Sequence, residues 1–275
     1  MYQKKSLLKK ILGFTLSISL GVFSIGCSST SNSSEKNDKK IVVGTIQVPG
    51  GELLNHLKSD VEKEGYELEV VIFNDYNTPN TALAEGDIDA NLFQHKPFLN
   101  ECIEKQNFDL TSVVDLFNVP LQAYSNKIKS LDELKSGSKL ALPNDPTNGS
   151  RALKMLESEG IIKIKEGVEL PAAKDIVENP RNIDFIEADA NQLPSLLPDV
   201  DAAFINGNFA LAAGLDASKQ SIYSPETDNT YVNVLACRTE DKNSEKIQVL
   251  KKVLSSDKSR EFIEENYKGI IIPVF

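Results

Sequence analysis

The chain has 275 residues, of which 40% are hydrophobic and 25% charged, so it is long enough for one or two folded domains and is not a wholly disordered chain. It carries 30 Lys and Arg against 40 Asp and Glu, a net charge of -10, and an acidic balance argues against a nucleic-acid partner. With only two His and three Cys, it cannot form a His-rich metal cage, a CxxC motif or a paired-Cys zinc site, and we expect no metal and no cofactor.

Residues 1–26 have the features of a signal peptide. The cationic start MYQKKSLLKK precedes the apolar run ILGFTLSISLGVFSI, which is shorter than the roughly 20 residues of a membrane-spanning helix but suits a signal-peptide core. Removal of this segment leaves 26 cationic residues against 40 acidic ones, a net charge of -14, because it takes away four lysines: Lys4, Lys5, Lys9 and Lys10.

Cys27 follows Gly26 at the end of the apolar run and is the predicted lipidation site. A small residue before such a cysteine resembles the lipobox of bacterial lipoproteins, in which the thiol is acylated and the cysteine becomes the new N-terminus. Ser24 stands where Leu is usual. The alternative is an ordinary signal peptide with an incidental cysteine. Residues 27–39 are rich in Ser, Asn and Lys and predict a flexible tether, so we expect a domain anchored at the outer, extracytoplasmic face of the cell membrane.

From Lys40 onward, strand and helix patterns alternate along the chain. Apolar runs rich in β-branched residues predict strands over 41–45, 67–73, 87–93, 112–117, 139–143, 183–188, 201–205 and 231–238. Helical spacing predicts helices over 52–65, 81–86, 97–106, 129–137, 151–160, 192–197, 244–256 and 259–267, and a last apolar run, IIIPVF, closes the chain. This alternation predicts an α/β fold with mainly parallel sheets and, at this length, two lobes.

Arg151 is notable because the chain has only four arginines. It follows the segment PNDPTNGS, in which Asn148 or Ser150 can cap the predicted helix. The first turn of a helix disfavours a cation, because the helix dipole is positive there. Free N–H groups beside a guanidinium therefore favour a bound carboxylate. The alternative is a solvated arginine paired with a surface acid, and spacing alone leaves both interpretations open.

Aromatic residues gather in DANLFQHKPFL, which contains Phe93, His95 and Phe98. At a strand exit their rings can turn into a cleft. The alternative is that both phenylalanines belong to the core and that His95 caps the helix begun by Pro97. Other candidates lie at the ends of elements or inside a strand, where polar groups need partners: Tyr76, Tyr124, Asn206, Asn208 and Asn233.

The sequence contains no GxSxG, GxxxxGK[ST] or HExxH motif, so we predict a binding protein rather than an enzyme. A lipoprotein hydrolase is the alternative from another class, and His95 is its only plausible base. An adhesin-like lipoprotein would not need a cation facing a cleft. Cys102 and Cys237 are expected to be lone thiols, with a disulfide outside the cell as the alternative.

Several segments together resemble the NlpA lipoprotein family, the methionine-binding lipoproteins of bacterial ABC importers. The similarity runs from Lys40 to Phe275, and its most specific parts are PNDPTN with a following Arg and FQH with a following aromatic residue. The resemblance implies a periplasmic-binding-protein-like fold, with two crossovers and the ligand at the hinge. We expect lobe I to comprise residues 40–123 plus 232–275 and lobe II residues 124–231.

The same resemblance implies roles for nine side chains. The cage for the thioether comprises Tyr76, Phe93, His95 and Phe98. Arg151 is the carboxylate-binding arginine, and Asn206 and Asn233 are the head-group asparagines. Tyr124 and Asn148 are further residues of the cleft. Phe98 stands where Tyr is usual, and NTYVN where NPYVN or SPYVN is usual.

The expected function is capture of methionine, the L enantiomer first, for the permease and ATPase of an ABC importer. D-methionine, methionine sulfoxide and a Met-containing dipeptide are the alternative ligands.

The lipobox predicts that Cys27→Ser releases the protein from the membrane fraction without unfolding it, because the acylated thiol is lost while the folded domain is unchanged. Fractionation and labelling with a fatty acid check this. A variant that still labels and still sediments with membranes contradicts the lipobox prediction.

Overall fold

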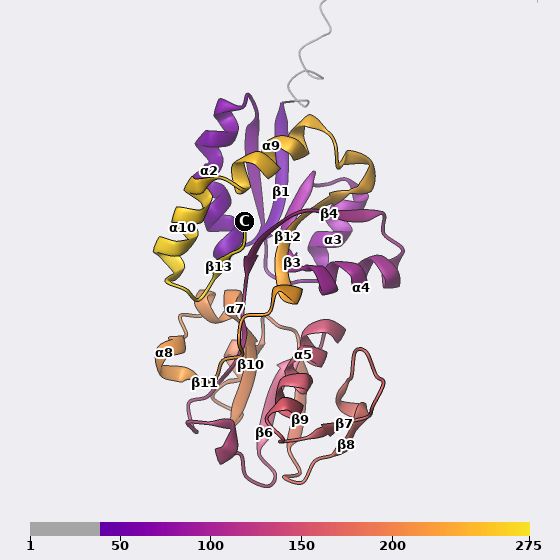
Figure 1. Ribbon diagram of the computed structural model, residues 1–275, viewed down its shortest axis with the longest axis vertical. Helices are drawn as coiled ribbons and strands as arrows, with labels where there is room; N and C mark the ends of the chain where they lie inside the picture. The colour runs from indigo at the N-terminus through magenta and orange to yellow at the C-terminus, as the bar shows by residue number, and fades with distance from the viewer. Residues whose placement is uncertain (1–38) are drawn as a thin grey trace, which may run out of the picture. The chain divides into compact units, whose positions relative to one another are not determined.

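Two mixed β-sheets organise residues 39–275, the part of the chain that this computed structural model describes (Figure 1). The predicted signal peptide, Cys27 and the predicted tether up to residue 38 lie outside the described residues. Across residues 39–275, no helix combines the length and the apolar character that crossing a bilayer requires.

The first sheet has six strands. In spatial order they are β13 (Ile272–Pro273), β4 (Leu110–Asn118), β12 (Val232–Arg238), β3 (Ala90–His95), β1 (Lys40–Ile46) and β2 (Glu67–Phe73). Strand β1 runs parallel to β2 and β3, whereas β12 is antiparallel to both of its neighbours.

Helices cover both faces of this sheet. One face packs on α2 (Glu52–Lys63), α9 (Glu245–Leu254) and α10 (Asp257–Tyr267), and the other on α3 (Thr78–Glu85) and α4 (Lys96–Gln106). Side chains of strand β12 alternate between the two faces: Leu235 and Cys237 join the apolar cluster beneath α2, α9 and α10, while Val234 and Ala236 join the cluster beneath α3 and α4. All four side chains are fully buried, so this strand is apolar on both faces.

The second sheet has five strands. They are β11 (Ser221–Tyr223), β5 (Leu121–Tyr124), β10 (Ala202–Asn206), β6 (Lys139–Pro143) and β9 (Asp184–Ala188), in spatial order. Helix α5 (Pro146–Ser158) packs on it through Leu153 and Leu156. The remaining elements here are α6 (Leu193–Leu196), α7 (Gly207–Ala212), α8 (Ala217–Gln220) and the small ladder of β7 (Lys163–Ile164) with β8 (Ile176–Glu178).

The chain crosses between the sheets twice. It passes from β4 to β5 through Val119 and Pro120, and it returns from β11 to β12 over residues 224–231. A third apolar cluster lies between the sheets and joins Ile46 and Phe93 to Phe209. The limits of the two lobes stay a prediction. Because β5 pairs with β10 in the second sheet, we propose that lobe I ends at Val119–Pro120 and not at residue 123.

The predicted α/β architecture is confirmed, with differences that have local causes. Both sheets are mixed rather than mainly parallel, because β12, β4 and β5 run antiparallel to neighbours. The predicted helix over 129–137 is only a 3-10 turn at Leu131–Glu133. Strands β2 and β6 have the predicted bounds, and Gly86, with φ of 85°, ends α3 as a left-handed cap.

Candidate ligand-binding site

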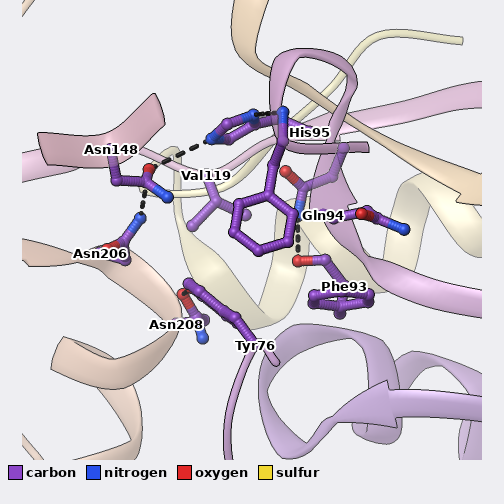
Figure 2. Close-up of a pocket in the computed structure, with 10 residues that line it drawn as sticks. Tyr76, Phe93, Gln94, His95, Val119, Asn148, Asn206 and Asn208 are labelled. Atoms are coloured by element: carbon purple, nitrogen blue, oxygen red, sulfur yellow. Dashed lines mark hydrogen bonds between the residues drawn. The ribbon is translucent and has the colours of Figure 1, made fainter. Parts of the chain in front are cut away.

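A pocket of about 300 Å³ lies where strand ends of both sheets meet (Figure 2). Phe93 and His95 come from the end of β3, and Asn206 is the last residue of β10. In α/β proteins, ligands bind at such carboxyl ends of strands. The ten lining residues are Tyr76, Phe93, Gln94, His95, Phe98, Val119, Asn148, Asn206, Asn208 and Asn233.

One wall of the pocket is aromatic. The ring centroids of Tyr76 lie 5.8 Å from both Phe93 and Phe98, and those two phenylalanines are 6.0 Å apart and nearly perpendicular. Phe209, from α7 on the opposite side, packs 4.9 Å from Tyr76. The structure therefore brings the predicted cage residues together: Phe98 makes edge-to-face contacts with Tyr76, Phe93 and His95, and Tyr76 is tilted against Phe93.

His95 both lines the pocket and caps a helix, so the two interpretations of this residue coexist. Its Nδ1 accepts a hydrogen bond from the N–H of Phe98 at 3.1 Å, at the start of α4. Its Nε2 lies 3.1 Å from Asn148 Oδ1. Because Nδ1 accepts, Nε2 carries the proton and donates. Burial lowers the pKa of His95 to about 4, so the ring is neutral near pH 7.

Asn148 is the centre of the polar wall. Its Oδ1 accepts from His95 and from Asn206 Nδ2 at 3.0 Å, while its Nδ2 donates to both oxygens of Asp145. Asp145 also accepts from the backbone N–H of Asn148 at 2.8 Å, and burial raises the pKa of its carboxyl. Asn148 is therefore held in one orientation by bonds to three other residues.

Two buried amide atoms of the pocket residues have no hydrogen-bond partner in the described part of the chain: Asn206 Oδ1 and Asn208 Nδ2. Asn208 Oδ1 accepts from the Tyr76 hydroxyl at 2.6 Å, and Asn233 Nδ2 donates to the Phe93 carbonyl at 3.2 Å. Buried polar atoms without partners cost free energy. A ligand that donates to Asn206 and accepts from Asn208 would remove that cost.

Arg151 lies in a different part of its helix from the predicted one. The cap of α5 is Asp145, not Asn148 or Ser150, so Arg151 falls in the second turn and the helix-dipole argument does not apply to it. The expectation failed because DPTNGS contains several residues that can cap a helix.

The Arg151 side chain is only 6% exposed, and the carbon of its guanidinium is 4.1 Å from the centroid of the Tyr231 ring. Among residues 39–275, its Nε and Nη1 find no hydrogen-bond partner. Burial lowers its pKa to about 10, which leaves it charged at neutral pH. No salt bridge of Arg151 occurs within residues 39–275, so it is not a solvated arginine paired with a surface acid.

Arg151 does not line the ten-residue pocket itself. It lines an adjoining cavity of about 300 Å³ at the two crossovers, together with Asn118, Val119 and Pro120. Val119 lines both cavities, so the two spaces meet at that side chain.

The structure does not bring Tyr124 to the pocket. Its side chain is 1% exposed and its hydroxyl donates to Gln122 Oε1 at 2.8 Å, within the apolar cluster. Asn208, a sequence candidate without a predicted role, lines the pocket, and so do Gln94 and Val119, which the sequence does not indicate. Gln94 bonds to Asn80 and Asn91, a network that no local pattern indicates.

Within the part of the chain that the structure describes, His, Cys, Asp and Glu side chains form no group that could hold a metal ion. Cys102 and Cys237 are both free thiols, as expected.

The model of the NlpA lipoprotein family matches residues 41–275. The chain belongs to the NlpA lipoprotein family. A relative from Salmonella typhi, named D-methionine-binding lipoprotein MetQ, is 43% identical over 240 residues, which are 86% of this chain and 88% of the relative. The resemblance found in the sequence is thereby confirmed.

Solved structures agree with the family assignment. A nutrient-binding protein from Burkholderia cenocepacia, described as bound to methionine, has 41% identity and a TM-score of 0.83, covering 86% of this chain and all of that one. A periplasmic substrate-binding protein of an ABC transporter from Coxiella burnetii has 37% identity and a TM-score of 0.79, over 85% and 100% of the two chains. These are binding proteins and the family is one of lipoproteins, so this chain is a substrate-binding lipoprotein rather than an enzyme, as predicted.

The buried His95 predicts a pH dependence of stability. Its pKa is about 4 in the folded protein against 6.5 as the ordinary value, so the unfolded chain takes up this proton first as the pH falls. Stability from the neutral ring is complete above pH 6.5 and decreases towards pH 4, by roughly 3 kcal/mol at about 1.4 kcal/mol per pH unit. Urea unfolding of the wild type and of His95→Gln, from pH 7 to 4.5, measures this term.

The variant should lose less stability over that interval than the wild type does. His56→Gln, which removes the exposed second histidine, is the matched control and should keep the wild-type pH dependence. Equal pH dependence in wild type and His95→Gln would show that His95 is not buried in its neutral form.

Proposed function

We propose that this protein is the lipid-anchored substrate-binding component of an ABC importer and that it captures methionine, with L-methionine as the first candidate. The observation that carries the proposal is the pairing of an aromatic wall with unpartnered buried polar atoms in one small pocket. The relative named for D-methionine and the neighbour described with methionine support the ligand class.

The head group of an amino acid complements the polar atoms. An ammonium group donates hydrogen bonds, which Asn206 Oδ1 can accept. A carboxylate accepts them, and Asn208 Nδ2 and the guanidinium of Arg151 can donate. We propose that the head group lies near Val119, where the pocket meets the cavity that Arg151 lines. Asn148 and Asn233 then orient their neighbours.

The aromatic wall suits a thioether. Sulfur is polarizable and packs favourably on aromatic edges, and the Phe98 ring is steeply inclined to those of Tyr76 and Phe93. Burial of an apolar side chain contributes about 1.5–3 kcal/mol, whereas micromolar to nanomolar binding needs about 8–12 kcal/mol. The head group and closure of the two halves must therefore supply most of the affinity, and the cage supplies selectivity.

The pocket offers one aromatic wall and one polar wall, which match the side chain and the head group of a single amino acid, and a Met-containing dipeptide stays an alternative ligand. Hydrolysis is not supported, because Nδ1 of His95 is occupied by the Phe98 N–H and the ten lining residues include no Ser, Thr or Cys. Anchoring through Cys27 and delivery to a permease with its ATPase complete the proposal.

L-methionine should bind the refolded, ligand-free domain and raise its melting temperature by several degrees, because a ligand at a thousandfold excess over its Kd stabilises the folded state by about 4 kcal/mol. Calorimetry and thermal unfolding with L- and D-methionine, methionine sulfoxide, alanine and glutamate measure this. Alanine and glutamate are the controls and should give much smaller shifts. Equal shifts for all five ligands would contradict a thioether cage.

Arg151→Ala should weaken L-methionine binding by about thirtyfold to several thousandfold, because loss of one partner of a buried charge pair costs about 2–5 kcal/mol. Arg151→Lys should recover only part of the loss, since an ammonium lacks the planar fork. The stability of the ligand-free domain should stay level or rise, because the variant no longer buries a charge without hydrogen-bond partners.

Methionine amide completes a thermodynamic cycle that compares two proteins, wild type and Arg151→Ala, with two ligands, methionine and its amide. It should bind the wild type poorly and lose little more in Arg151→Ala, because the carboxylate that the arginine would meet is already absent. Calorimetry of both proteins with both ligands tests this. If the two losses simply add, Arg151 and the carboxylate do not meet.

A further inference from the structure

The second crossover carries a side chain that touches residues from both sheets. Before β12, the chain forms a 3-10 turn over Asn229–Tyr231. Asp228 closes this turn, since its Oδ1 accepts from the N–H of Thr230 at 2.8 Å and its carbonyl accepts from the N–H of Tyr231 at 3.2 Å. Thr230 occupies the position noted in NTYVN, and it supplies an N–H that a proline would lack. Local bonds therefore fix the backbone of Tyr231.

This turn is also tied to the first crossover. Asn118, at the end of β4, donates from Nδ2 to Asn229 Oδ1 at 3.0 Å and is paired with Val232 in the sheet. The residue before the first crossover, Asn118, is thus bonded to the second crossover next to Tyr231.

The Tyr231 ring contacts two residues of the candidate site. Its centroid lies 4.1 Å from the guanidinium carbon of Arg151, which extends from α5, and 5.2 Å from the His95 ring, which ends β3. The His95 ring is nearly perpendicular to it, at 83°. The half-buried ring of Tyr231 therefore contacts both α5, which packs on the second sheet, and β3, which belongs to the first sheet.

Arg151 depends on this contact for its orientation. Within residues 39–275, Nε and Nη1 have no hydrogen-bond partner that would fix the plane of the guanidinium. A long side chain has many rotamers to lose on ordering, and a planar guanidinium stacks well on an aromatic face. The ring of Tyr231 provides such a face, and the nearby Asp228 carboxylate adds an attraction that does not depend on the plane.

We infer that Tyr231 is a positioning residue for Arg151, which it holds in orientation to receive a ligand carboxylate. This inference rests on the proposed function. It also links the carboxylate site to the hinge, because Tyr231 belongs to a crossover while Arg151 belongs to α5.

The test compares Tyr231→Leu and Tyr231→Phe by calorimetry with L-methionine, D-methionine and L-methionine amide. Tyr231→Leu should weaken binding of the acid by about three- to thirtyfold, the range between an exposed and a desolvated cation–π contact. Tyr231→Phe keeps the ring and should stay within about threefold of the wild type. The amide, which lacks the carboxylate, should lose much less in Tyr231→Leu.

Two further proteins separate positioning from general damage to the fold. In an Arg151→Ala background, Tyr231→Leu should add little, because the side chain that it orients is gone. Tyr223→Leu removes another half-buried tyrosine, on β11 and outside the pocket, and should leave affinity unchanged. Melting temperatures of the ligand-free variants show whether each one folds.

The outcomes distinguish this inference from the proposed function. If the wild type binds neither enantiomer of methionine, the proposed function fails. If the wild type binds and Tyr231→Leu binds equally well, the positioning role is wrong. It is also wrong if acid and amide weaken equally, if Tyr231→Phe loses as much as Tyr231→Leu, or if the effects of Tyr231 and Arg151 simply add.

Discussion

The candidate site depends on one buried amide oxygen. Asn148 Oδ1 accepts from His95 at the end of β3 and from Asn206 at the end of β10, so the two sheets share an acceptor. The hydrogen bonds between Asn148 and Asp145 fix the direction of that oxygen, because Asn148 Nδ2 donates to both carboxylate oxygens of Asp145. As a result, His95 is held in one tautomer, and Asn206 presents its own oxygen without a protein partner.

Arg151 is a largely buried cation at the crossovers, and within residues 39–275 its Nε and Nη1 have no hydrogen-bond partner. Burial lowers its pKa to about 10, and the Tyr231 ring and the Asp228 carboxylate partly compensate the buried charge. Burying a charge with incomplete hydrogen bonding costs free energy. Under the proposed function, the carboxylate of a ligand would offset part of that cost, so ligand binding and burial of Arg151 would favour each other.

Local patterns predicted the elements well and the site only in part. Strands β2 and β6 are runs of apolar residues between turn signals, so their bounds could be read directly. The start of α5 could not, because Asp145 competes with Asn148 and Ser150 as a cap, and only the fold shows which one accepts. The aromatic cage came from family resemblance. The orientation of Tyr124 into the core and the contact between Arg151 and Tyr231 depend on tertiary packing, which leaves no periodic signal in the sequence.

The bond between Asn118 and Asn229 has a mechanical consequence. Two linkers that are fastened side by side resist sliding and shearing of the bodies they connect, and they leave bending about the fastened point as the soft motion. Under the proposed hinge closure, opening and closing would then follow nearly a single path. A clamp with so few degrees of freedom loses little entropy when it shuts, so more of the intrinsic interaction energy with the ligand remains as measured affinity.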